Sequence, residues 1–403
     1  MDVFVARQPI FDPLQRVTGY ELLFRNGPEN FFPRVDGSYA SSRVIHDSVH
    51  VFGLGALSAS RRLYINVTRD ILVAELIRLV PPEVAVVEIL ESIPPDPEVL
   101  AACRSLRASG YAIALDDFVF RPGYEPLVEL ADVVKVDFLA TRGAERKAVV
   151  ERFARPGVKF LAEKIESQGE FTEATKLGYT LFQGYFFCKP EMVTARDIPA
   201  YKVNYLRLLK VANEPVFDMN KVEEVLRHEP SASVKLLRYL NSAIFGLRHK
   251  VTSIRQALLL LGERPCRRWV SLLAVTGIGG DKPGEIVVMS LVRARFLELL
   301  SAMADNKERG VELFLLGMLS LVDVMIGRPM DEVLGPLALS DDVRNALLEG
   351  RGAFAPWHRL AVAYERAEWP EVESLVTSLK LDPNAVADAW RDSIAWANEI
   401  FSA

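Results

Sequence analysis

Residues 111–118 read YAIALDDF, an apolar run with two adjacent aspartates, Asp116 and Asp117, near its end. A run of this length is typical of a β-strand buried on both faces, as in a parallel sheet. Segments with helical spacing, such as residues 97–109 and 144–154, alternate with such runs, and this alternation predicts a (β/α) barrel or a doubly wound sheet. The other runs are residues 62–68 (RLYINVT), 84–90 (VAVVEIL), 133–139 (VVKVDFL), 158–165 (VKFLAEKI) and 179–187 (YTLFQGYFF).

Polar side chains at the strand ends favour the barrel. Almost every predicted strand carries a carboxylate, an amide or an amine at or near its C-terminal end. In a (β/α)₈ barrel these ends meet at one mouth, whereas an open sheet would spread them along an edge. We therefore expect an α/β fold, a TIM-like barrel, over residues 1–195. The polar set comprises Glu21, Asn66, Glu88, Asp116, Asp117, Lys135, Glu163 and Gln183.

The chemistry of this set points to divalent cations. Carboxylate and amide oxygens select Mg²⁺ or Mn²⁺ over zinc, and clustered carboxylates repel one another unless cations neutralise them. Adjacent Asp116 and Asp117 could bridge two metals, the usual arrangement for in-line attack on a phosphodiester. Lys135 could hold the attacking water, and Glu163 could deprotonate it. Each acid alone has a simpler interpretation as a helix cap or loop residue, so the hypothesis depends on the joint pattern.

Seven short motifs, in the same order, resemble those of the EAL-type cyclic di-GMP phosphodiesterases. The resemblance covers about residues 1–195. It implies a barrel that hydrolyses cyclic di-GMP to linear pGpG with two metal ions, Mg²⁺ or Mn²⁺. The motifs are GYELLFR (19–25), INVT (65–68), VEILES (87–92), ALDDF (114–118), VKVD (134–137), AEKIES (162–167), which resembles the family's AEGVET, and QGYFFCKP (183–190).

The resemblance also implies roles for individual residues. One metal would be held by Glu21, Asn66, Glu88 and Asp116. The second would be held or neighboured by Asp116, Asp117 and Glu163. Lys135 would contact the nucleophilic water. The dinucleotide would contact Gln8, Arg25 and Gln183, and the Arg25 guanidinium suits a phosphate because it can bind two oxygens.

One loop departs from the family. After Phe118 the family usually continues Gly-Thr-Gly-Tyr-Ser-Ser, in a loop that helps to order the metals and couples to dimerisation. Here residues 119–126 read VFRPGYEP, although Glu91, which would anchor that loop, is present. Two functions therefore stay open. The chain is either a metal-dependent phosphodiesterase, or a weakly active or inactive EAL domain that acts as a cyclic di-GMP receptor or protein-interaction scaffold.

The second half predicts an all-helical domain over residues 196–403. Residues 314–326 are apolar nearly all round, which is typical of a helix at a domain centre. Residues 233–242 and 254–262 resemble the HDOD module, which implies an output or interaction domain with a protein partner. Ser320 and Leu321 stand where related hydrolases carry a metal-binding His-Asp pair, and they cannot supply those ligands. We expect His228, His249 and His358 at surfaces or helix caps.

Bulk properties restrict the remaining options. A net charge of −5 gives no support to nucleic-acid or membrane-surface binding, and no apolar run is long enough to span a bilayer. We expect a cytoplasmic protein, because the three cysteines show no paired spacing. We expect no signal peptide, because no basic region followed by an apolar stretch stands at the N-terminus. A homodimer is compatible with the sequence. His46, Asp47 and His50 could form a further metal site, but no other ligand is evident.

Overall fold

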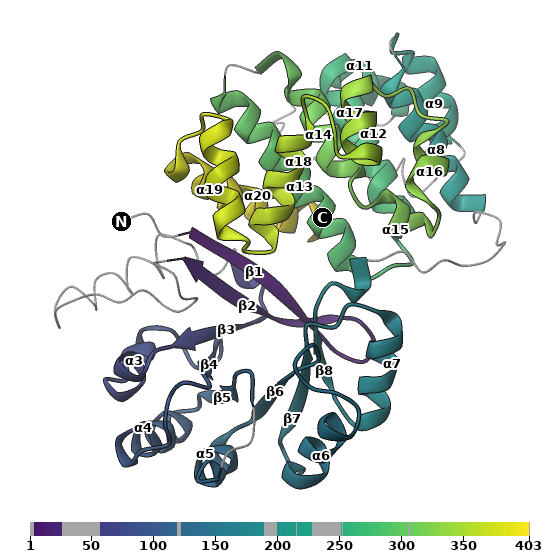
Figure 1. The fold of residues 1–403 in the computed structure, drawn as a ribbon. Coiled ribbons are helices and arrows are strands. Elements are labelled where there is room, and N and C mark those ends of the chain that lie inside the picture. Colours follow the sequence, from purple (N-terminus) through teal and green to yellow (C-terminus); the bar gives the residue numbers. More distant parts are fainter. Residues whose placement is uncertain are drawn as a thin grey trace. The chain divides into compact units, whose positions relative to one another are not determined.

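The computed structural model describes residues 4–25, 57–118, 122–188, 200–214, 216–227, 251, 253–304 and 307–402 (Figure 1). The chain divides into two compact units. The barrel unit consists of Met1–Lys189 together with Val362–Glu399, and the helical unit contains the helices within Pro190–Ala361. The predicted boundary at residue 195 lies outside the described residues, as do His46, Asp47, His50, His228 and His249.

The barrel is closed, with its strands hydrogen-bonded in sequence order and the last paired to the first. This confirms the predicted barrel. β1 differs from the others because it runs antiparallel to both neighbours. A turn in which the backbone N–H groups of Leu14 and Arg16 donate to Asp12 Oδ1 joins it to β2 and leaves no room for a helix. The strands are β1 (Phe4–Phe11), β2 (Val17–Arg25), β3 (Arg62–Val67), β4 (Ala85–Ile89), β5 (Ala112–Leu115), β6 (Val133–Asp137), β7 (Lys159–Glu163) and β8 (Leu181–Gln183).

Helices follow the parallel strands and lie outside the barrel (Figure 1). Asp96 caps one by accepting from the N–H groups of Glu98 and Val99, and Ser167 begins another in a capping box with Glu170. The predicted helices at residues 97–109 and 144–154 are confirmed. The helices are α3 (Arg69–Val73), α4 (Pro97–Ala108), α5 (Glu125–Leu130), α6 (Ala144–Phe153) and α7 (Gln168–Leu177).

The barrel interior has an apolar layer beneath a polar one. Side chains two positions apart on a strand share a face. A polar residue two positions after an apolar interior residue therefore also faces the interior. Tyr64 precedes Asn66 by two positions, and Val86 likewise precedes Glu88. Gly19 stands two positions before Glu21, and its missing side chain leaves room for the Tyr64 ring. The apolar layer comprises Ile10, Tyr64, Val86, Ala114, Val133, Leu161 and Leu181.

The barrel unit also includes residues from the end of the chain. They come from α18 (Ala355–Glu365), α19 (Trp369–Ser378) and α20 (Pro383–Ser402). Arg7 of β1 donates to Asn398 Oδ1 at 3.4 Å, and the Arg366 guanidinium lies 4.9 Å from the centre of the Tyr185 ring. Segments at opposite ends of the sequence therefore fold together in this unit.

Only helices and turns occur among the described residues of the helical unit, as the sequence predicts. A single helix over residues 314–326 is a wrong prediction, because the chain leaves the helix at Ser320 and Leu321. Ser320 Oγ donates to the Gly317 carbonyl at 2.7 Å and accepts from Arg293 Nη1 at 3.1 Å. The helices are α8 (Ala200–Asn213), α9 (Met219–Arg227), α11 (Ile254–Leu261), α12 (Glu263–Ile278), α13 (Gly284–Met303), α14 (Gly310–Leu319), α15 (Val322–Ile326), α16 (Met330–Leu334) and α17 (Asp341–Glu349).

His358 corrects a second expectation. Its Nε2 atom is buried on α18 and has no hydrogen-bond partner within the described ranges, so this histidine is neither a surface residue nor a cap. Burial, together with the positive charge of Arg293, lowers its pKa to about 4. No helix in the described part of the chain is both long and apolar enough to cross a membrane.

Candidate functional site

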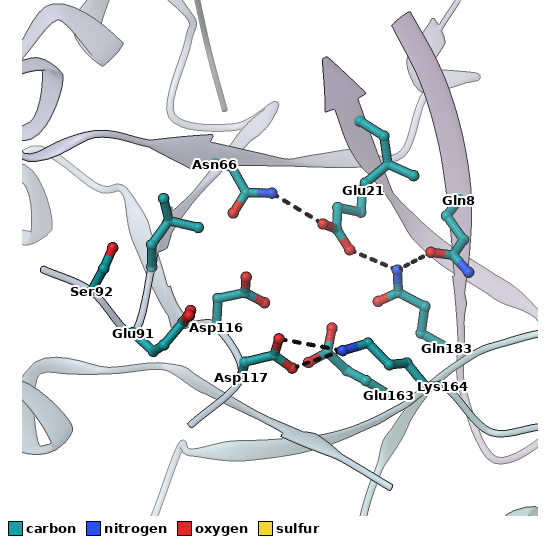
Figure 2. Close-up of a pocket in the computed structure, with 12 residues that line it drawn as sticks. Gln8, Glu21, Asn66, Glu91, Ser92, Asp116, Asp117, Glu163, Lys164 and Gln183 are labelled. Atoms are coloured by element: carbon teal, nitrogen blue, oxygen red, sulfur yellow. Dashed lines mark hydrogen bonds and ion pairs between the residues drawn. The ribbon is translucent and has the colours of Figure 1, made fainter. Parts of the chain in front are cut away.

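A cavity of about 510 Å³ lies over the polar layer of the barrel (Figure 2). Its size falls within the range of roughly 300–1,000 Å³ that is usual for small-molecule sites. It brings together predicted residues that lie on β1, β2, β3, β7 and β8 or directly follow β5, although they are far apart in the sequence. The lining comprises Gln8, Glu21, Leu23, Asn66, Leu90, Glu91, Ser92, Asp116, Asp117, Glu163, Lys164 and Gln183.

Two of the predicted residues do not line the cavity. Glu88 and Lys135 are fully buried next to its acidic residues. Arg25 ends β2, and its side chain lies outside the described part of the structure. The structure therefore brings together all of the predicted polar set, with Glu88 and Lys135 in its buried part.

Amide groups hold Glu21 in place (Figure 2). Its Oε1 accepts from Asn66 Nδ2 at 3.0 Å, and its Oε2 accepts from Gln183 Nε2 at 2.6 Å. Gln183 Nε2 also donates to Gln8 Oε1 at 2.8 Å. Because β1 is antiparallel, Gln8 pairs directly with Glu21 across the β1–β2 ladder. The backbone register thus brings Gln8 to the site from the middle of a strand.

Lys135 lies at the centre of the carboxylates. Its ammonium forms ion pairs with Asp116 Oδ1 at 2.7 Å, Glu163 Oε1 at 2.8 Å and Glu21 Oε2 at 3.2 Å, and it also pairs with Glu88. One positive charge, which is itself fully buried, therefore faces four acidic side chains. A fixed ammonium alone cannot balance so many carboxylates, and the site favours additional cations.

Burial and mutual repulsion shift the pKa values of the acids. The pKa of Glu88 rises well above its usual value, chiefly through burial and then through the charge of Glu21. Burial raises the pKa of Glu163 to about 8, against the opposing effect of Lys135. Burial would lower the pKa of Lys135, but the surrounding carboxylates outweigh it and raise that pKa. These shifts indicate that some of the acids stay protonated at neutral pH as long as no metal ion is bound.

Several buried oxygens in this layer have no hydrogen-bond partner among the described residues. They are Asn66 Oδ1, Glu88 Oε2, Glu163 Oε2 and Gln183 Oε1. All four are acceptors, and an unsatisfied buried acceptor is costly. A divalent cation satisfies such oxygens directly and also offsets the carboxylate charge. The donor set therefore fits a hard metal ion.

A second group of acids lies at the edge of the cavity. Carboxylate oxygens of Glu91, Asp116 and Asp117 all lie within 4.8 Å of one another. This places Glu91 beside the predicted metal ligands, whereas the sequence suggested only that it anchors a loop. Residues 119–121 of that loop lie outside the described residues, so its anchoring stays a prediction.

Sequence reasoning assigned no role to Lys164. Its ammonium lies 3.3 Å from each carboxylate oxygen of Asp117 and 2.6 Å from Asp137 Oδ2, and the side chain lines the cavity (Figure 2). A signal was present in the sequence, because this lysine stands where the family motif AEGVET has glycine. A charged residue at a glycine position beside a predicted ligand would have identified it.

Comparison with known proteins gives two full-length relatives. The uncharacterized protein YuxH of Bacillus subtilis is 33% identical over 411 residues, which span 100% of both chains. The cyclic di-GMP phosphodiesterase CdgJ of Vibrio cholerae is 34% identical over 401 residues, which span 98% of this chain and 93% of the relative. Family models match an EAL domain over residues 57–190 and an HDOD domain over residues 198–327.

The chain belongs to the EAL–HDOD family. Both resemblances drawn from the motifs are thereby confirmed. Among solved structures, this EAL–HDOD protein is similar to a calcium and cyclic di-GMP complex of Klebsiella pneumoniae BlrP1, with 24% identity and a TM-score of 0.38 over 46% of this chain and 55% of the other. It is also similar to the Bacillus subtilis YkuI protein, with 18% identity and a TM-score of 0.36 over 65% of this chain and 71% of the other.

Proposed function

We propose that the barrel unit is a metal-dependent phosphodiesterase that hydrolyses cyclic di-GMP to linear pGpG. The relative CdgJ, which is named for this activity and matches nearly the whole chain, supports the proposal. The observation that carries it is the polar layer around Lys135, where buried carboxylates and unsatisfied oxygens fit divalent cations. A cavity of about 510 Å³ above this layer has room for a ligand.

The ligands for the cations come from this layer. Glu21, Asn66, Glu88 and Asp116 would hold one ion, and Asp116, Asp117 and Glu163 would hold or neighbour the other. Bound there, divalent cations would neutralise the phosphodiester and stabilise the entering and leaving oxygens. Oxygen donors of this kind favour Mg²⁺ or Mn²⁺.

Two side chains of the barrel would hold and deprotonate the attacking water. Hydrolysis forms a bond between the water oxygen and phosphorus, and it breaks the bond between phosphorus and the ribose O3′. Glu163 would accept the water's proton, because its carboxylate lies at the cavity and a bound cation would keep it deprotonated. Lys135, whose ammonium is fixed by ion pairs with Asp116 and Glu163, would hold the water.

Other groups would bind the dinucleotide. Gln8 and Gln183 line the cavity and are already joined by a hydrogen bond, so they present a fixed pair of amides. Arg25 ends the strand that carries Glu21, and its guanidinium would bind a phosphate through two oxygens.

The test is to incubate the full chain with cyclic di-GMP and Mn²⁺ and to separate the products by chromatography. We expect pGpG from the wild-type protein, and a loss of at least about a hundredfold in Glu21→Gln and Glu163→Gln. Glu151→Gln on α6 is the matched control, because this carboxylate is exposed and pairs only with Lys147 among the ion pairs of the described residues. Nucleotide binding without product would instead establish the receptor function, and no binding would contradict both.

We also infer that the helical unit recruits a protein partner or a second copy of the chain. Ser320 and Leu321 stand in the place of a metal-binding pair, so binding is a better-supported role for this unit than hydrolysis. The free thiols of Cys103 and Cys266 support a cytoplasmic location, because a reducing compartment keeps thiols in this state.

A further inference from the structure

Lys164 adopts an unusual backbone conformation directly after β7. It follows Glu163 at the end of β7, and its φ of 56° lies in the left-handed region. This region costs a residue with a side chain about 1–2 kcal/mol, whereas glycine adopts it freely. The local backbone therefore suits the glycine of the motif AEGVET, and the lysine is kept there despite the strain.

The lysine side chain reaches the acids of the second group. Asp137 anchors its ammonium at 2.6 Å, and Asp137 is itself held because its Oδ1 accepts from the N–H groups of Leu139 and Ala140. From this anchor the ammonium lies 3.3 Å from both carboxylate oxygens of Asp117. It thus contacts the two oxygens that Asp117 would offer to a metal.

Lys164 and Lys135 differ in their freedom to move. Lys135 has no exposed surface and is enclosed by carboxylates, so its charge is a permanent part of the site. The Lys164 side chain is 46% exposed and the Asp117 side chain is 38% exposed. Solvent can therefore stabilise the Lys164 ammonium when it leaves Asp117, and a competing cation can displace it.

We propose that Lys164 is a built-in counter-cation for Asp117 that weakens the binding of a second divalent cation. The inference rests on the proposed function, since it assumes that the acids of the cavity bind metal. The ammonium neutralises Asp117 and occupies the approach to its oxygens. A divalent cation at Glu91, Asp116 and Asp117 must first push this ammonium aside. The free protein therefore holds one divalent cation tightly and the second only weakly.

The experiment counts bound Mn²⁺ by equilibrium dialysis of the full chain, without nucleotide, so that turnover plays no part. In the wild-type protein we expect one tight site and a second site with a dissociation constant at least about tenfold higher. Lys164→Gly restores the residue that the backbone favours, and Lys164→Met removes the charge while keeping the length of the side chain. Both variants should tighten the second site at least about tenfold.

Lys147→Met is the matched control. Lys147 lies on α6 in an exposed ion pair with Glu151, so its loss changes the net charge by the same amount and should leave both sites unchanged. If both Lys164 variants bind Mn²⁺ as the wild-type protein does, the inference is wrong while the proposed function stands. An equal shift in the control would assign the effect to net charge and would also overturn the inference. No Mn²⁺ binding to any of the proteins would overturn the inference together with the metal site of the proposed function.

Discussion

Lys135 Nζ lies 2.8 Å from Glu163 Oε1, and both side chains are buried at the mouth of the barrel. The pair comes from neighbouring parallel strands, β6 and β7, whose polar residues point to the same interior. Lys135 supplies the positive charge that allows the surrounding acids to be buried in the absence of metal. The site is therefore held together by the same groups that the proposed hydrolysis would use.

Replacing Lys135 tests this electrostatic role. Lys135→Met removes the ammonium and leaves several acids facing one another, so we expect the metal-free protein to lose about 3–5 kcal/mol of unfolding free energy. Urea unfolding measures the loss, and Mn²⁺ should restore part of it because the cation replaces the missing charge. The exposed Lys147→Met should change stability by less than about 1 kcal/mol. A Lys135→Met protein as stable as the wild type would contradict this account.

Mn²⁺ binding should strengthen as the pH rises toward 8. The pKa of Glu163 is raised to about 8 by burial, so this acid is protonated at pH 7 in the metal-free protein. A bound cation favours the carboxylate, and binding at pH 7 therefore releases a proton. The Mn²⁺ dissociation constant should fall between pH 6 and pH 8 and level off above pH 8. In Glu163→Gln the proton is absent, and the slope over this range should decrease by about one proton.

Gly19 makes the apolar layer sensitive to a single methyl group. A Cβ atom at this position would lie 2.9 Å from the Arg62 carbonyl and 3.0 Å from the Tyr64 ring. Gly19→Ala should therefore cost about 1–3 kcal/mol of unfolding free energy, measured by urea unfolding. Gly169→Ala is the control, because its Cβ would meet only Ser167 at 3.8 Å within α7, where alanine is the better helix former. Equal stability of the two variants would show that the layer can adjust.

The barrel was predictable because apolar runs alternate with helical segments and polar residues stand at the ends of the runs. Tyr64 and Asn66 illustrate this pattern, since an apolar residue and a polar residue share one face of a strand and the polar residue lies nearer the mouth. The reversal of β1 was not predictable from apolar runs, because a short turn rather than a helix joins it to β2. The contacts of long side chains were also not predictable from the sequence. The approach of Lys164 to Asp117 depends on a left-handed backbone and on the anchor at Asp137, neither of which a motif contains.

The unit that the helices at the end of the chain join was likewise not predictable from the sequence. Helical periodicity does not say which unit a helix joins. The hydrogen bond between Arg7 and Asn398 links residues at opposite ends of the sequence. The break at Ser320 was also hidden, because the surrounding residues are apolar on both sides of it.

His358 should make the helical unit sensitive to acid. Its pKa is about 4 in the folded protein, compared with an ordinary value of 6.5, because burial and the nearby charge of Arg293 disfavour the protonated ring. The unfolded chain takes up this proton first as the pH falls, so the stabilising contribution is present above pH 6.5 and is lost progressively toward pH 4. From pH 7 to pH 5 the loss from this group should be about 2 kcal/mol. Urea unfolding at both pH values measures it, and His358→Gln should reduce the difference between them by that amount. An undiminished acid loss in His358→Gln would show that the histidine titrates normally and that other groups control the acid response.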